Sequence, residues 1–234
     1  MKIALISGSS RGIGKAITKL LLKNKWRVYG FSRNNNITHP NFYHKTVNLA
    51  NLKSCNTIKF PEIKTDDTIL LINNASTIGG ITQLDKKLAK EIYSEYNLNI
   101  ISPTIMCSNF LAKYQCNNKI IFNISSGAAQ NPIISWGTYC SSKAALEMLT
   151  KVIEQEKYKN LRIFSVSPGV VNTDMQKEIR ETSKLNFPIV KKFQDYHQNN
   201  ELEKPNNIAK KLYHIIQNLQ HFTQNHLYLR DIKI

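Results

Sequence analysis

Two residue types that can transfer a proton stand four positions apart, at Tyr139 and Lys143. The surrounding pattern predicts a helix, and residues i and i+4 lie on the same face of a helix. A nearby ammonium group favours the phenolate and lowers the pKa of a tyrosine from about 10 toward neutral pH. We therefore predict that Tyr139 acts as a general acid or base. The alternative is a buried structural tyrosine, because this spacing also arises by chance in many helices.

Ser126 follows a predicted strand, in the run N-I-S-S-G at positions 123–127. Its hydroxyl group can hold the oxygen of a substrate carbonyl beside Tyr139. Together the serine, the tyrosine and the lysine predict proton transfer to or from a carbonyl or alcohol.

A glycine-rich turn, G-S-S-R-G-I-G at positions 8–14, joins the first apolar run to an amphipathic segment. Gly8 permits a tight turn, Gly12 lets the backbone approach a pyrophosphate, and Gly14 allows close packing of helix on strand. The free N–H groups and the positive end of the helix dipole face the phosphates. The turn predicts a dinucleotide site, although an ordinary glycine-rich turn is the alternative.

The second predicted strand ends in Y-G-F-S-R at positions 29–33. It lacks the acidic residue that binds the ribose 2′-hydroxyl in enzymes that use NAD. Arg33 stands there instead, and Arg11 lies in the glycine-rich turn. Guanidinium groups bind phosphate with two hydrogen bonds. The two arginines predict a 2′-phosphate and hence NADP(H), with two ordinary surface arginines as the alternative.

Short apolar runs alternate with longer amphipathic segments, which predicts an α/β fold. Parallel strands with right-handed crossovers then form a doubly wound sheet of about seven strands with helices on both faces. The predicted strands are Lys2–Ile6, Arg27–Phe31, Phe42–Val47, Thr68–Ile72, Lys119–Ile124, Arg162–Val166 and His226–Leu229. The predicted helices are Gly12–Asn24, Leu52–Lys59, Asp85–Tyr93, Leu98–Tyr114, Tyr139–Tyr158, Thr173–Glu181 and Asn206–Leu219. The weakly periodic stretch Glu181–Pro205 predicts a long excursion of the kind that often covers a site.

Composition excludes several other classes of protein. The 234 residues are 41% apolar, which suits one domain with a full core. The net charge is +16, but the basic residues are scattered, so we predict a solvated basic surface and no nucleic-acid partner. The four cysteines have no metal-ligand spacing, which predicts reduced thiols, no metal and a cytoplasmic location. We find neither a targeting segment nor an apolar stretch of about 20 residues, so we predict no membrane partner.

These motifs occur in the order found in the classical short-chain dehydrogenase/reductase family, which the sequence resembles over nearly its whole length. Positions 7–14 resemble its T-G-x-x-x-G-x-G loop, and N-N-A-S at 73–76 resembles N-N-A-G, with Ser76 in place of glycine. Asn99 matches the family's active-site asparagine, and P-G-V-V-N-T at 168–173 resembles the P-G-x-V-x-T segment. The resemblance implies that residues 1–234 form one NADP-binding Rossmann domain, with a substrate lid around residues 174–205.

The resemblance also implies what each catalytic residue does. Tyr139 protonates the carbonyl oxygen, Ser126 orients that carbonyl, and Lys143 lowers the pKa of Tyr139 and binds the hydroxyls of the nicotinamide ribose. Asn99 holds a water that links Lys143 to bulk solvent.

Thr173 and the backbone of Val171 match the positions that grip the nicotinamide carboxamide in the family. Asn48 stands where the family often has an aspartate that contacts the adenine. The expected cofactor contacts are Gly8, Ser10, Arg11, Gly12, Ile13, Gly14, Arg33, Asn48, Asn74, Ala75, Tyr139, Lys143, Pro168, Gly169, Val171 and Thr173.

The segment from 173 to 206 resembles the sepiapterin reductase and benzil reductase branch of the family. This resemblance implies a small-molecule substrate, either a dicarbonyl compound or the side-chain ketone of a pterin. Asp231 stands where that branch carries an acidic residue near the substrate, and a solvated charge is the alternative. Trp136 either lines the substrate pocket or packs in the core.

Two other functions stay open. One is a different reductase or alcohol dehydrogenase on the same scaffold, such as a 3-oxoacyl carrier-protein reductase, whose acidic carrier the basic charge would suit. The other is a non-catalytic NADP-binding or nucleic-acid-binding protein, against which the intact Ser126, Tyr139 and Lys143 set argues. The family resemblance implies a homodimer or homotetramer formed through the helices predicted at Leu98–Tyr114 and Tyr139–Tyr158.

Overall fold

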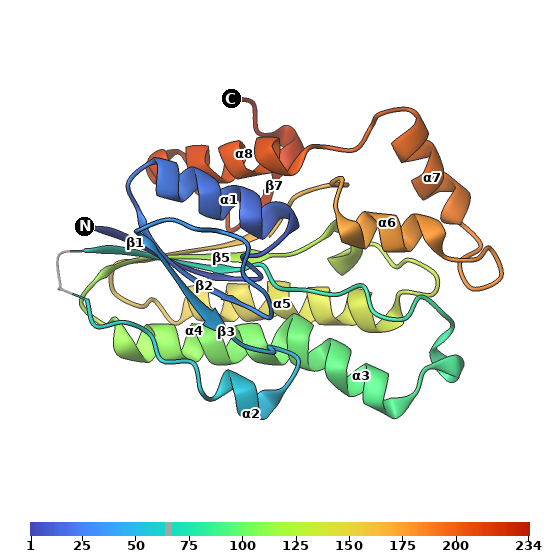
Figure 1. Cartoon of the computed structure of the whole chain (residues 1–234), viewed down its shortest axis with the longest axis horizontal. Coiled ribbons are helices and arrows are strands. Elements are labelled where there is room, and N and C mark those ends of the chain that lie inside the picture. Colours follow the sequence, from blue (N-terminus) through green and yellow to red (C-terminus); the bar gives the residue numbers. More distant parts are fainter. Residues whose placement is uncertain (64–66) are drawn as a thin grey trace.

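The structure, a computed structural model, describes residues 1–63 and 67–234. Its strands form one sheet of seven, all neighbours parallel, in the order β3-β2-β1-β4-β5-β6-β7 (Figure 1). The strands are β1 (Lys2–Ser7), β2 (Arg27–Ser32), β3 (Phe42–Thr46), β4 (Thr68–Asn73), β5 (Asn118–Ile124), β6 (Leu161–Ser167) and β7 (His226–Tyr228). The predicted doubly wound parallel sheet is therefore confirmed, and every strand end lies within one residue of its predicted place.

Helices cover both faces of this sheet. They are α1 (Gly12–Lys23), α2 (Leu52–Cys55), α3 (Ala89–Tyr96), α4 (Ser102–Lys113), α5 (Gly137–Gln155), α6 (Asp174–Glu181), α7 (Val190–Gln198) and α8 (Pro205–Gln217). Across the described ranges, none of these helices is both long and apolar enough to cross a membrane.

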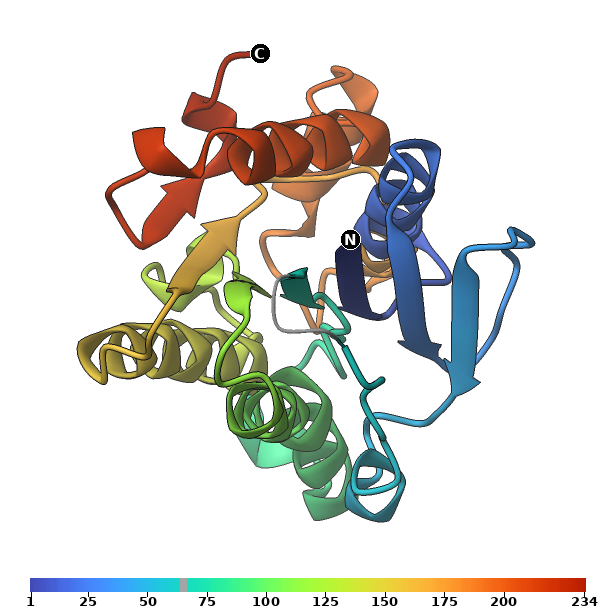
Figure 2. The same ribbon diagram turned by 90° about the vertical axis from the view of Figure 1, so that its left-hand side faces the viewer.

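Helices lie on both faces of the sheet (Figure 2), and a layer of the core packs on each face. Successive side chains of a strand point to opposite faces. Ala4 and Ile6 of β1 therefore pack with α1 and α8, whereas Leu5 packs in the layer that includes α4. All three side chains are fully buried. The sheet is thus covered on both sides, as parallel sheets require.

The predicted helices at Leu52–Lys59 and Tyr139–Tyr158 have different bounds in the structure. The helix predicted at Leu52–Lys59 ends at Cys55, because Ile58 and Phe60 leave the helix to enter the core beside β4. The helix predicted at Tyr139–Tyr158 is α5, which begins at Gly137 and ends at Gln155. Lys157 stops it, because its φ of 52° is left-handed.

The region between β4 and β5 also differs from the prediction. A 3₁₀ turn at Leu84–Lys86 and the separate helix α3 replace the single helix predicted at Asp85–Tyr93. The helix predicted at Leu98–Tyr114 begins with a π-helical turn, Asn97–Ile101, and continues as α4. Such turns are rare and occur mostly as single widened turns inside α-helices.

The excursion predicted at Glu181–Pro205 contains α7, a helix that the sequence pattern did not predict. Helices α6 and α7 pack on each other, and α7 is anchored by Phe193, which is buried with Phe187 against Trp136. The chain that leads into α6 and the chain that leaves α7 are joined, because the N–H of Glu203 donates to the Val170 carbonyl oxygen at 2.9 Å. We call residues 171–203 the lid segment.

The carboxyl ends of the parallel strands lie at one edge of the sheet. The glycine-rich turn follows β1, the N-N-A-S segment follows β4, Ser126 follows β5, and the segment from Pro168 follows β6. The strand order reverses between β1 and β4, and ligands bind at such a switch point in doubly wound sheets. The fold therefore gathers the predicted site residues at this edge.

Candidate active site

The glycine-rich turn is held tightly against the segment that follows β4. Gly8 has a φ of 69° and its N–H donates to the Phe31 carbonyl oxygen at 2.8 Å. The side-chain amide of Asn74 donates to the carbonyl oxygens of Ser7 and Gly8, each at 3.1 Å. A Cβ on Gly14 would lie 2.1 Å from the Gly8 carbonyl oxygen. Only glycine fits there, so the first turn of α1 approaches the loop as a dinucleotide cradle requires.

Ser7 joins the loops after β1 and β4. Its hydroxyl oxygen accepts hydrogen bonds from the backbone N–H groups of Asn74 at 2.9 Å and Ala75 at 3.0 Å. The side chain is 3% exposed, so these bonds are protected from water. They fix Asn74 and Ala75 beside the glycine-rich turn, as the sequence predicts for two cofactor contacts.

The residues predicted to bind the adenosine half lie at the surface. Arg33 and Asn48 are exposed after β2 and β3, and the Asn48 side chain accepts from the N–H of Ala50 at 3.1 Å. Arg11 is exposed at the start of α1, 3.3 Å from the Asp174 carboxylate. The Ser10 carbonyl oxygen accepts from Asn36. These groups are open to a phosphorylated ligand.

The segment after β6 lies opposite the glycine-rich turn. Gly169 has a φ of 81°, and Thr173 caps α6 by accepting from the N–H of Gln176 at 3.4 Å. A Cβ on Gly12 would lie 3.3 Å from the Thr173 methyl group. Gly12, Asn172 and Thr173 line one surface hollow. The structure thus brings Thr173 and Gly12 together, as a shared cofactor site requires.

Tyr139 lies in the first turn of α5 and is 7% exposed. The Ser126 hydroxyl lies close enough to that of Tyr139 to favour the phenolate, and the Ser126 oxygen accepts from the N–H of Ala128 at 3.2 Å. Trp136 contacts the Tyr139 ring edge to face, with ring centroids 5.6 Å apart. The structure thus places Ser126 and Tyr139 near each other.

Lys143 is buried one turn later, with its ammonium nitrogen 5.7 Å from the centroid of the Tyr139 ring. It donates to the carbonyl oxygen of Ile124 at 2.7 Å. Burial lowers the pKa of Lys143 to about 8 and raises the pKa of Tyr139 to about 12, although the Ser126 hydrogen bond favours the phenolate. The expected lowering of the tyrosine pKa was wrong for this structure, because the loss of water around both groups outweighs their attraction.

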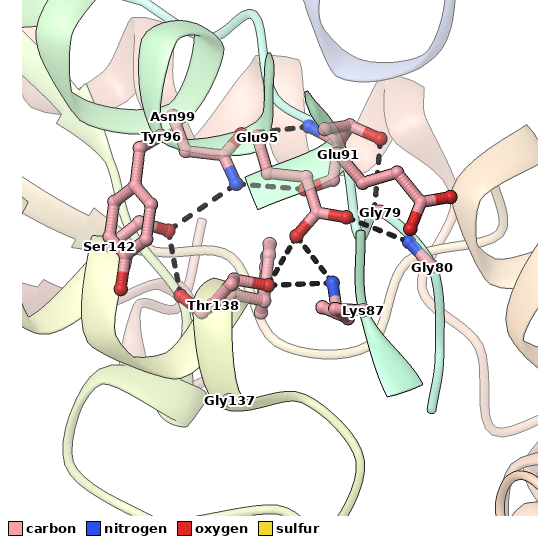
Figure 3. Close-up of polar contacts among 12 residues, drawn as sticks. Gly79, Gly80, Lys87, Glu91, Glu95, Tyr96, Asn99, Gly137, Thr138 and Ser142 are labelled. Atoms are coloured by element: carbon pink, nitrogen blue, oxygen red, sulfur yellow. Dashed lines mark hydrogen bonds and ion pairs between the residues drawn. The ribbon is translucent and has the colours of Figure 1, made fainter. Parts of the chain in front are cut away.

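Asn99 lies in the π-helical turn and is 1% exposed. Its side-chain oxygen accepts from the Ser76 hydroxyl and the Thr77 N–H, each at 2.9 Å. Its amide nitrogen donates to the Thr77 carbonyl oxygen at 2.9 Å and to Ser142 at 3.3 Å (Figure 3). Ser76, which replaces the family's glycine, is thus a partner of Asn99. The side chain of Asn99 binds protein groups that join the loop after β4 to the first turns of α5.

Two buried acids beside the site were not predicted. Glu95 of α3 binds Lys87 and Thr138, the residue before Tyr139. Glu147 of α5 accepts from the hydroxyl of Ser125, next to Ser126, at 2.8 Å. In sequence both acids look like exposed residues of amphipathic helices, so no signal in a single sequence marks them.

Comparison with known proteins agrees with this arrangement. Residues 2–184 match the family described as short chain dehydrogenase. Benzil reductase ((S)-benzoin forming) of Bacillus cereus is 32% identical over 236 positions, covering 93% of this chain and 94% of that protein. Sepiapterin reductase of Bos taurus is 34% identical over 155 positions, covering 64% and 57%. A short-chain dehydrogenase/reductase structure from Saccharomyces cerevisiae shares the fold, with a TM-score of 0.82 at 24% identity, covering 99% and 97%.

The lowered pKa of Lys143 predicts a pH-dependent stability. The unfolded chain holds a proton on this lysine up to a pKa near 10.5, and the folded chain up to about 8. Between these values the unfolded state binds more protons, so the free energy of unfolding rises with pH. Relative to Lys143→Met, the wild type should gain about 3 kcal/mol from pH 8 to 10.5 in urea titrations. Lys19→Met, on the exposed face of α1, controls for lost charge, and a pH-independent difference for Lys143→Met would contradict the prediction.

Proposed function

Because this chain belongs to the short-chain dehydrogenase family, we propose that it is an NADP(H)-dependent carbonyl reductase of a small ketone or dicarbonyl. Tyr139 is its proton donor. The observation that carries the proposal is the burial of Tyr139 with Lys143 beside its ring and with Ser126 near its hydroxyl group. A sensor or structural protein has no need of a phenol, a hydroxyl and an ammonium group buried together at the edge where cofactors bind.

The chain's own residues can move the proton. When bound, the nicotinamide supplies the hydride for the carbonyl carbon. A pKa of about 12 keeps the Tyr139 hydroxyl protonated at neutral pH, which is the form that donates to a carbonyl oxygen. Ser126 is positioned to hold that oxygen. Lys143, fixed by the Ile124 carbonyl group, lies where its charge stabilises the phenolate left behind.

The surroundings of Tyr139 support an apolar, aryl-bearing substrate. Trp136 stacks on Phe187 at 5.6 Å and contacts Phe193 at 5.3 Å, so a buried aromatic cluster that includes two residues of the lid segment packs beside the proton donor. The benzil reductase of Bacillus cereus, similar along nearly its whole length, supports a dicarbonyl.

The choice of NADP(H) rests on Arg11 and Arg33. Both are exposed beside the ends of β1 and β2, where the adenosine half of a dinucleotide lies in this fold. A cytoplasmic location belongs to the same proposal and agrees with the four unpaired cysteines.

A homodimer or homotetramer is proposed through α4 and α5. A groove between these helices is lined by Leu111, Leu149 and Val152, and Met148 and Val152 on α5 are 59% and 47% exposed. Exposed apolar side chains on a helix pair favour burial against a second copy.

Replacing the proton donor tests the function. Tyr139→Phe should lower kcat for NADPH-linked reduction of benzil by at least about 100-fold, the usual contribution of a general acid. Tyr93→Phe, on an exposed tyrosine, is the matched control. Full activity in Tyr139→Phe would overturn the proposal. Sepiapterin, diacetyl and an acetoacetyl thioester complete the substrate panel, and turnover of the thioester alone would assign a 3-oxoacyl reductase instead.

Removing the arginines tests the cofactor. Arg33→Ala and Arg11→Ala should each raise the KM for NADPH by roughly 10-fold or more, because a charged hydrogen bond contributes about 1.5–3 kcal/mol. The KM for NADH should stay within about twofold of the wild type. Arg230→Ala, at an exposed arginine after β7, is the control. Equal changes for both cofactors would contradict the assignment.

Charging the groove tests the assembly. Met148→Glu with Val152→Glu should convert the protein to monomers in sedimentation velocity, because buried unpaired carboxylates oppose association. Ile234→Glu, at another exposed apolar residue, should leave the assembly intact. An unchanged sedimentation coefficient in the double variant would place the contact elsewhere.

A further inference from the structure

A buried ionic cluster lies directly beside the first turn of α5 (Figure 3). The Glu95 carboxylate binds the Lys87 ammonium at 2.5 Å and accepts from the Thr138 hydroxyl. Its other oxygen accepts from the N–H of Gly80 at 2.9 Å. Lys87 also donates to the Thr138 hydroxyl oxygen at 2.8 Å. We call Lys87, Glu95 and Thr138 the buried triad.

The buried triad is poorly explained by stability alone. The side chains of Lys87 and Glu95 are 1% and 5% exposed, and taking two charges out of water can cost as much as their attraction returns. Packed apolar side chains of the same volume often stabilise the folded state as much as a buried ion pair does. A charged pair instead requires one defined geometry, because every group around it must be in place.

The buried triad holds the start of a helix that has no side-chain cap. The first N–H groups of a helix lack partners within it, and the N-cap residue of α5, Trp136, makes no side-chain hydrogen bond to them. Thr138, the second residue of α5, is instead fixed from outside by Glu95 and Lys87. The next residue in the chain is Tyr139. The start of α5 therefore depends on contacts from α3 and the turn before it.

Further contacts from the same region hold the same helical turn. The Tyr96 hydroxyl lies 2.8 Å from the Ser141 hydroxyl, and Asn99 donates to Ser142. On the other side, the turn at Gly79 is closed over the carboxylate: a Cβ on Gly79 would lie 2.1 Å from the Glu95 carboxyl carbon. The segment after β4, α3 and α5 are thus tied at the buried triad.

We propose that Glu95, held by Lys87, is a positioning residue that fixes Tyr139 against Ser126 by binding Thr138. The proposal rests on the proton-donor role of Tyr139. A misplacement of a reacting group by about 1 Å can cost about 100-fold in rate. Loss of the Thr138 contact therefore lowers kcat, whereas the cofactor contacts on the loops after β1, β4 and β6 stay in place.

The test compares Thr138→Val with Thr138→Ser. Valine has the shape of threonine but cannot bind Glu95, whereas serine keeps the hydroxyl. With NADPH and benzil, or the panel compound that is turned over, Thr138→Val should lower kcat 10- to 100-fold, with the KM for NADPH within twofold. Thr138→Ser should keep at least half of the wild-type kcat. Thr104→Val removes a hydroxyl that binds within its own helix and should have wild-type kcat.

Two further variants separate positioning from folding. If Thr138→Val lowers the folded fraction, Lys87→Met with Glu95→Leu removes both charges together and is measured in its place. A folded double variant with reduced kcat supports the proposal, and one with wild-type kcat overturns it. Thr138→Val with wild-type kcat, beside an inactive Tyr139→Phe, also overturns the positioning role and leaves the proposed function intact. Activity in Tyr139→Phe would overturn the proposed function itself.

Discussion

Burial of the phenol and the ammonium group side by side is the constraint on which the rest of the structure depends. Tyr139 and Lys143 are both buried at the carboxyl edge of the sheet, and burial disfavours the charged form of each. Fixed dipoles partly offset this effect of burial. The Ser126 hydroxyl lies near the tyrosine, and the Ile124 carbonyl oxygen accepts a hydrogen bond from the lysine. Preorganised groups of this kind need no rearrangement when charge develops.

The loops around this pair come from strands far apart in sequence, and buried polar contacts give them one arrangement. Ser7 and Asn74 join the loops after β1 and β4, and Asn99 joins the loop after β4 to α5. Apolar packing tolerates small shifts, whereas a hydrogen bond is sensitive to distance and angle. The two core layers therefore give the sheet its stability, and the polar contacts at its carboxyl edge give the site its geometry.

Much of this follows from the sequence. Short apolar runs located all seven strands, and motif order identified the family. The π-helical turn was not predicted, because the apolar pattern runs through Asn97–Ile101 without a break. Helix α7 was not predicted, because it is only nine residues long and its two buried residues, Val190 and Phe193, give too little periodicity to detect. The pKa of Tyr139 was misjudged because spacing indicates proximity to Lys143 but not the loss of water. Glu95 looks like an exposed acid in the sequence, because the residues that bury it are distant in the chain.

The bridge at Val171 and Glu203 gives the lid segment a property of its own. Because its two ends are joined beside the sheet, the segment forms a closed loop. The cost in conformational entropy of bringing those ends together is part of folding and does not depend on what the loop contains. Changes of length or composition inside the loop then leave the strand spacing and the cofactor edge undisturbed. The chain between Thr173 and Glu203 can thus vary as a unit, while the residues that face the glycine-rich turn stay in place.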